Sequence, residues 1–131
     1  MNISKKQVAS QLKEVAKLLD VLGEEPFKAR AYTNAIRQIE NYEGDFSLLL
    51  VSDQLTQLKG IGAGLAAELA HLKEQEIIPS LLDLYERVPI GVRELFLVSG
   101  LGAKKVSALW ANDIDSLEEL IMAADDGRIE A

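Results

Sequence analysis

The sequence predicts an all-α protein made of two small helical lobes, each built around one tight turn between helices. Apolar residues recur three and four positions apart along most of the 131-residue chain, which is the spacing of one face of an α-helix. The sequence lacks alternating runs of β-branched residues and Asn-Gly turns, the usual signs of strands. A Gly-x-Gly segment also occurs twice, 40 residues apart. We place the lobes at residues 1–76 and 77–131.

The first lobe is expected to begin with two long helices. Residues 5–22 have an apolar face, Ser4 can cap the start of this helix, and Gly23 can end it. A second helix is expected over residues 27–42, because Pro26 is well suited to a first helical turn. The residues expected to face inward on this second helix are Phe27, Ala31, Ala35, Ile36 and Ile39. Shorter helical segments are expected at 46–51, 53–57 and 63–76.

The second lobe is expected to contain shorter helices separated by proline and glycine. Pro79 suits the start of one helix and Pro89 breaks the chain after it. The capping-box pattern Ser116–Glu119 predicts the start of a last helix. Helices are therefore expected at 80–87, 91–97, 103–110 and from 117 onward. Residues 126–131 end without a capping residue, which we interpret as the lead-in to a longer protein.

The repeated segment has the pattern apolar-x-Gly-apolar-Gly, at residues 58–62 and again at 98–102. Two glycines one residue apart allow a tight turn and a close approach of another chain. The helix that follows offers free N–H groups and the positive end of its dipole to an anion. This is the helix-hairpin-helix pattern, which indicates contact with the phosphate backbone of DNA. The glycines expected at this contact are Gly60, Gly62, Gly64, Gly100 and Gly102.

A structural explanation of these glycines is that they only join helices in a compact fold. A single copy would favour that explanation, whereas two copies with matching apolar positions favour DNA contact. The copies differ in charge, since Lys104 and Lys105 follow the second turn while Ala63 and Gly64 follow the first. The first copy is therefore expected to bind more weakly, through backbone N–H groups and Lys59.

The net charge of the chain is unusual for a DNA-binding protein. It is −7 at pH 7, whereas nucleic-acid binders are usually basic. Residues 1–50 are neutral, with seven Lys or Arg and seven Asp or Glu, so the acidic excess lies in the rest of the chain. We expect modest, salt-dependent affinity for DNA. The alternative is an acidic helix-hairpin-helix domain that binds protein and binds DNA weakly or not at all.

Composition also limits the class of protein. The chain has no cysteine, which excludes disulfides, thiolate catalysis and cysteine metal sites. No signal peptide and no apolar run of membrane-spanning length is visible. We expect a monomeric cytoplasmic protein associated with the nucleoid, with no membrane partner.

Lys28 and Tyr32 form a second candidate site, because residues four apart share one face of a helix. An ammonium and a phenol suit a terminal phosphate, and Arg30 and Arg37 can approach the same duplex from other sides of the helix. The structural alternative is an exposed helix face with a half-buried tyrosine. Three other features are better explained by structure than by function: His71 at the surface, Trp110 in the core, and Asp113-Ile114-Asp115 at a helix start.

With these motifs in place, the chain resembles the N-terminal region of family X DNA polymerases of the bacterial and archaeal type. There, a helical 8 kDa domain precedes a fingers or thumb subdomain and the polymerase palm. The matching segments are Leu18–Tyr32, Leu58–Ala66, Val88-Pro89, Gly100–Lys105 and Ser116–Leu120. The resemblance implies a DNA repair module that grips gapped or nicked DNA.

The resemblance also implies roles for individual residues. Lys28 and Tyr32 match the phosphate pocket of the family, and both glycine turns match its backbone-binding hairpins. Backbone carbonyls would match its sites for a monovalent cation, Na⁺ or K⁺; these belong to Thr56, Leu58 and Ile61, and to Phe96, Val98 and Leu101. Members that excise a 5′-deoxyribose phosphate use a lysine as Schiff-base nucleophile, and Glu68 stands at that position. The resemblance therefore predicts no catalytic residue and no lyase activity here, although an amine such as Lys28 is an alternative nucleophile.

Overall fold

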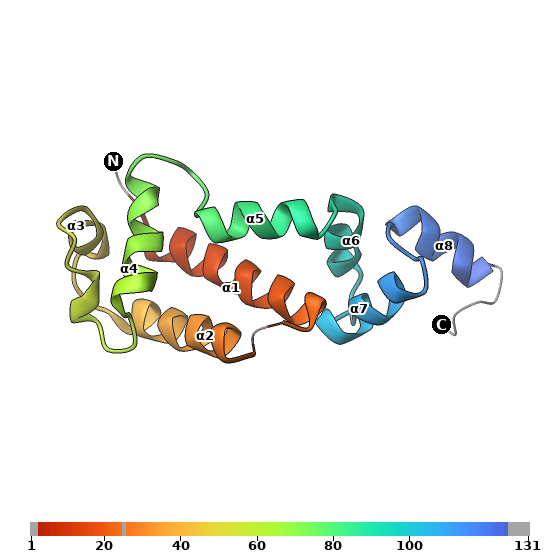
Figure 1. Ribbon diagram of the computed structural model, residues 1–131, viewed down its shortest axis with the longest axis horizontal. Helices are drawn as coiled ribbons and strands as arrows, with labels where there is room; N and C mark the ends of the chain where they lie inside the picture. Colours follow the sequence, from red (N-terminus) through yellow and green to blue (C-terminus); the bar gives the residue numbers. More distant parts are fainter. Residues whose placement is uncertain (1–2, 25, 126–131) are drawn as a thin grey trace.

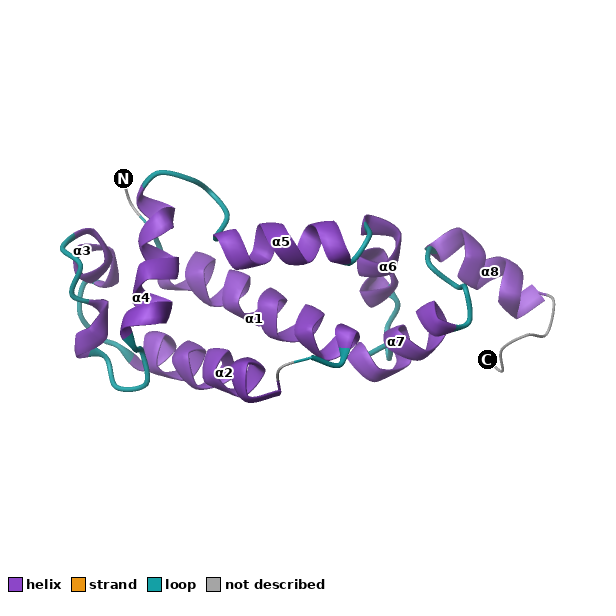
Figure 2. Cartoon of the chain, viewed as in Figure 1, coloured by secondary structure: helices purple, strands orange, loops and turns teal. Residues whose placement is uncertain are grey.

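The computed structural model of the chain describes residues 3–24 and 26–125. Within these ranges it forms eight α-helices and three short 3₁₀ helices, with no strand (Figures 1 and 2). The predicted all-α fold is therefore confirmed. In chain order the elements are α1 (Lys5–Leu22), α2 (Pro26–Asn41), α3 (Phe46–Val51), η1 (Leu55–Gln57), α4 (Ala63–Ala70), η2 (His71–Lys73), α5 (Pro79–Arg87), α6 (Ile90–Glu94), η3 (Leu95–Leu97), α7 (Ala103–Ala111) and α8 (Leu117–Asp125).

Helix ends form where the sequence supplies capping residues. Ser4 Oγ accepts a hydrogen bond from the Gln7 N–H at 3.1 Å, and Gly23 ends α1 in the left-handed conformation with φ 68°. The hydroxyl of Ser116 accepts from the Glu119 N–H at 3.1 Å at the start of α8. These contacts confirm the predicted caps of the first and last helices, since each satisfies backbone groups that a helix end leaves unpaired.

Helix α1 lies at the centre of the molecule. Its residues Leu12, Val15 and Leu18 are fully buried, and it packs against α2, α5 and α7 (Figure 1). Most of the buried side chains form one hydrophobic cluster that runs from Ile3 to Val106; the buried Ile114 and Ala123 lie outside it. This cluster takes residues from both sides of the predicted lobe boundary at 76–77, so the two parts share a core through α1. Whether they also fold as separate units stays a prediction.

Polar contacts fix the segment that joins these two parts. The side-chain amide of Gln11 donates to the Glu76 carbonyl at 2.7 Å, and its oxygen accepts from the Ile78 N–H at 2.9 Å. Arg87 on α5 pairs with Glu24, which follows α1. The connection therefore lies directly against α1.

The structure corrects two details of the first lobe. Phe27 is 80% exposed and Ala31 is exposed, whereas Ala29 and Tyr32 are buried in their place. At 100° per residue, Phe27 lies about 200° round the helix from Ala29, so α2 turns it to solvent. The predicted helix 63–76 is also too long, because α4 and η2 end at Lys73 and the following backbone binds Gln11 instead.

No helix in the described ranges is both long and apolar enough to cross a membrane.

Candidate nucleic-acid interface

The two glycine turns adopt the same backbone conformation. Leu58 has φ −78° and ψ 129°, and its counterpart Val98 has φ −78° and ψ 124°. The Ile61 N–H donates to the Leu58 carbonyl at 3.1 Å, as the Leu101 N–H does to the Val98 carbonyl at 3.2 Å. We call η1, residues 58–62 and α4 the first hairpin, and η3, residues 98–102 and α7 the second hairpin. The sequence repeat is thus a structural repeat.

The first glycine of each turn is required by the backbone. Gly60 has φ 90° and Gly100 has φ 89°, a region in which a side chain is strained. The positive φ reverses the chain between the 3₁₀ turn and the following helix. This glycine is therefore explained by the fold.

The second glycine of each turn is not required by the backbone. Gly62 and Gly102 have φ −83° and −96° with extended ψ values, which any residue adopts. A Cβ atom at either position would meet nothing within 4 Å. Each is also the N-cap of its helix, and no side chain caps α4 or α7 among the described residues. The surface at both helix starts is consequently open to a partner that approaches the backbone.

Positive charge is unequal at the two open helix starts. Lys104 and Lys105 lie exposed in the first turn of α7, whereas the first turn of α4 contains no cation. Lys59 is exposed in the glycine turn of the first hairpin, before α4 begins. None of these three lysines has an ion pair within the described part of the chain. The second hairpin therefore has the stronger combination of backbone donors and cations for a phosphate.

The Lys28 and Tyr32 site is a cavity of about 340 Å³ formed by α2, α4 and the start of α5. Tyr32 is only 5% exposed, so its ring belongs to the core. Glu68 lies on the cavity wall, where its Oε1 accepts a hydrogen bond from the Ser80 N–H at 2.5 Å. The residues that line this cavity are Lys28, Ala31, Tyr32, Gly64, Leu65, Glu68 and Ser80. The structure thus brings together three of the predicted DNA-binding residues, Lys28, Tyr32 and Gly64, with a carboxylate beside them.

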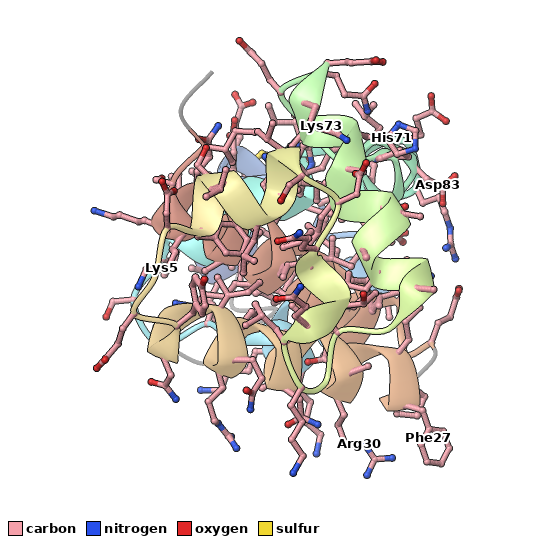
Figure 3. All side chains as sticks on the ribbon, turned by 90° about the vertical axis from the view of Figure 1, so that its left-hand side faces the viewer. Lys5, Phe27, Arg30, His71, Lys73 and Asp83 are labelled. Carbon is pink, nitrogen blue, oxygen red and sulfur yellow. The ribbon has the colours of Figure 1, made fainter. Side chains whose placement is uncertain are left out.

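Phe27 is a surface residue that the sequence pattern assigns to the core. Its ring points away from the protein at the start of α2, next to Arg30 (Figure 3). The Arg30 guanidinium lies 4.6 Å from the ring centroid. An exposed aromatic ring beside a cation is typical of surfaces that stack on nucleic-acid bases. The helical period gives a signal that residue type alone conceals, because Phe27 lies about 180° round α2 from the buried Ile36.

The remaining candidate residues form no ligand cluster. Within the described ranges, no three His, Cys, Asp or Glu side chains are grouped so that they could hold a metal ion. His71 is exposed, and Trp110 is half-buried against the core. At the proposed cation sites, the carbonyls of Leu58 and Val98 each accept the hydrogen bond of their turn. A carbonyl oxygen has two lone pairs, so each keeps one for a further partner.

Comparison with known proteins agrees with this geometry. A family model described as "Helix-hairpin-helix domain" matches residues 3–77, which include the first hairpin. The DNA polymerase/3'-5' exonuclease PolX of Bacillus subtilis (strain 168) is 29% identical over 119 residues. That alignment covers 88% of this chain and 20% of the polymerase. The chain therefore spans about a fifth of the length of the relative that it matches.

Proposed function

Because the chain belongs to the helix-hairpin-helix domain family, we propose that it binds DNA through the phosphate backbone, without sequence specificity. It acts as a non-catalytic module of a family X DNA repair polymerase. The similarity to a DNA polymerase supports this context. Gapped or nicked duplex is the proposed substrate, with one hairpin on each side of the interruption.

The observation that carries this proposal is the pair of second glycines. Gly62 and Gly102 leave the N-cap positions of α4 and α7 without a side chain and without a side-chain cap, although the backbone there does not require glycine. A phosphate oxygen can approach such a helix start closely and accept hydrogen bonds from its N–H groups. Lys104 and Lys105 add charge to the second of the two.

The cavity that contains Lys28 supports phosphate binding less strongly. Lys28 supplies an ammonium group and Tyr32 contributes a wall, but Glu68 presents a carboxylate to the same space. A carboxylate cannot form the imine of a lyase and repels a phosphate. We therefore propose a module in which position 68 supplies no nucleophile for deoxyribose-phosphate lyase chemistry.

A monovalent cation at the backbone carbonyls of each hairpin is part of the proposal. Na⁺ or K⁺ prefers oxygen ligands, and each turn offers three carbonyls on one short segment. The residues that would hold it are Thr56, Leu58 and Ile61 in the first hairpin, and Phe96, Val98 and Leu101 in the second. Such an ion would offset the charge of the phosphate that approaches the turn.

The proposal is tested by titrating salt against binding of gapped, nicked and intact duplexes. Replacing Lys104 and Lys105 by glutamine should lower the slope of log Kobs against log salt by about 1.8, at about 0.9 for each phosphate contact. Lys59→Gln should lower it by at most about 0.9. Lys73, which pairs with Asp53 at 2.7 Å, is the control, and Lys73→Gln should leave the slope unchanged. No binding to any duplex at about 50 mM salt would refute the proposal.

A second function, binding to a protein partner, is favoured by the net charge of −7. It predicts that Lys104→Glu with Lys105→Glu leaves partner binding unchanged. The DNA-binding proposal predicts that the same double variant loses DNA binding, since two cations become anions beside the phosphate. The variant therefore separates the two functions.

A further inference from the structure

Four lysines lie along one side of α1: Lys5, Lys6, Lys13 and Lys17. They line a cavity of about 590 Å³, whose other side includes Glu40 of α2. We call this the lysine groove. The hairpin motifs do not include it, because its residues come from the helix that also forms the centre of the core.

The lysine groove is continuous with the second hairpin. A neighbouring cavity of about 460 Å³ shares Lys13 and Lys17 with it and reaches Gly102 and Ala103 at the open start of α7. Lys17 connects the lysine groove to the second hairpin, because it lines both cavities and its Nζ lies 4.4 Å from the centroid of the Phe96 ring in η3. A chain that leaves the second hairpin can therefore enter the groove directly.

Lysines outnumber carboxylates in the linings of the two cavities. Glu14 lies 3.1 Å from Lys17 and Glu40 lies 3.6 Å from Lys13, and Asp20 is the third carboxylate. Ion pairs between partly exposed groups such as these are weak, so a phosphate can replace the carboxylate. Lys6 is exposed and has no ion pair in the described part of the chain.

Two further cations lie just beyond the groove, where Lys104 and Lys105 follow Ala103 on α7. In the linings of the two cavities, four lysines oppose three carboxylates, and Lys104 and Lys105 line neither cavity. On a chain of net charge −7, this is a local excess of positive charge. Such a surface attracts a polyanion such as the phosphate backbone of DNA.

We propose that the lysine groove binds one phosphodiester strand of DNA that continues from the second hairpin. The inference rests on the proposed function and adds that the groove holds the single-stranded part of the DNA. Lys6 and Lys17 are eleven residues apart, a span of about 16 Å along the helix. That is about five nucleotides at the rise of one strand.

The test compares two probes of equal duplex length, one blunt and one with a ten-nucleotide single-stranded extension. The variant is Lys6→Gln with Lys13→Gln, which removes two exposed charges seven residues apart on one helix face. The control is Lys73→Gln with Arg87→Gln, which removes two charges outside the groove. Circular dichroism and the Tm of each variant confirm that it is folded.

The proposal predicts that the groove variant has a smaller salt slope only on the extended probe, by about 1.4 at about 0.7 for each single-strand contact. The control variant should keep the wild-type slope on both probes. An unchanged slope on the extended probe, or an equal loss on both probes, would overturn the groove proposal while DNA binding stands. If the wild-type protein binds neither probe, the proposed function fails and the groove proposal with it.

Discussion

At the scale of single residues, Glu68 shows how a position can change its role. By resemblance this position holds a nucleophilic lysine in lyase members of family X. In the structure the Glu68 carboxylate accepts the N–H of Ser80 and so caps the start of α5. A negative charge at a helix N-terminus is favourable because it faces the positive end of the dipole. The residue therefore joins α4 to α5 and contributes to stability.

Replacing Glu68 tests this structural role. Glu68→Lys should lower the free energy of unfolding by about 1 kcal/mol, because it removes the cap and places a cation at the helix start. Glu68→Gln keeps an oxygen acceptor and should cost less. Urea denaturation measures both variants. Equal stability of Glu68→Lys and the wild-type protein would show that the contact with Ser80 does not stabilise the fold.

At the scale of elements, the two glycines of a hairpin should respond differently to alanine. Gly100→Ala should destabilise the protein by about 1–2 kcal/mol, because its φ of 89° is strained for any residue with a side chain. Gly102→Ala should cost at most about 1 kcal/mol, because glycine is a better N-cap than alanine, while the backbone there is extended and a Cβ would meet nothing within 4 Å. Thermal and urea unfolding compare the two.

The opposite order, with Gly102→Ala the more damaging to stability, would mean that the fold itself needs the second glycine. The fold alone would then explain the missing side chain at the helix start, which would no longer indicate a binding partner. Gly60 and Gly62 of the first hairpin provide the same comparison independently, because their backbone angles match those of the second.

The sequence predicts most helices and both hairpins because capping residues and apolar period are local signals. It fails where a neighbouring element decides. Phe27 faces solvent because the packing of α2 against α1 selects the face that carries Ala29 and Tyr32. The helical segment formed by α4 and η2 ends before residue 76, where the sequence predicted its end. Gln11, far away in the sequence, binds the backbone at Glu76 and Ile78 instead. The Gln11 contact is not visible in the local sequence, whereas the helical period does place Phe27 about 180° from Ile36, on the opposite face of α2.

The candidate site was predictable to a similar extent. Both turns follow from the sequence repeat, and their lysines are neighbours of the repeat in the sequence, whereas the lysine groove has no such local signal. Lys13 and Lys17 look like the polar side of an amphipathic helix until α7 is placed against α1. Only the tertiary structure shows that they lie beside Gly102.

At the scale of the whole molecule, the shared core predicts one cooperative unfolding transition. The hydrophobic cluster joins residues from both predicted lobes through α1. Trp110, the single tryptophan of the chain, lies in α7 and reports on the second lobe. Its fluorescence should therefore change together with far-UV circular dichroism, which reports on all helices. Separate midpoints would show that residues 1–76 and 77–131 unfold as independent domains.

The central claim is that the open start of the second helix in each hairpin, α4 or α7, binds a DNA phosphate. Its most direct test is the affinity of Gly102→Ala for a gapped duplex at low salt, measured by fluorescence anisotropy together with the Tm. The account predicts binding that is weaker by about tenfold or more, about 1.4 kcal/mol, with stability within about 1 kcal/mol of wild type. Wild-type affinity in a folded Gly102→Ala protein would contradict it.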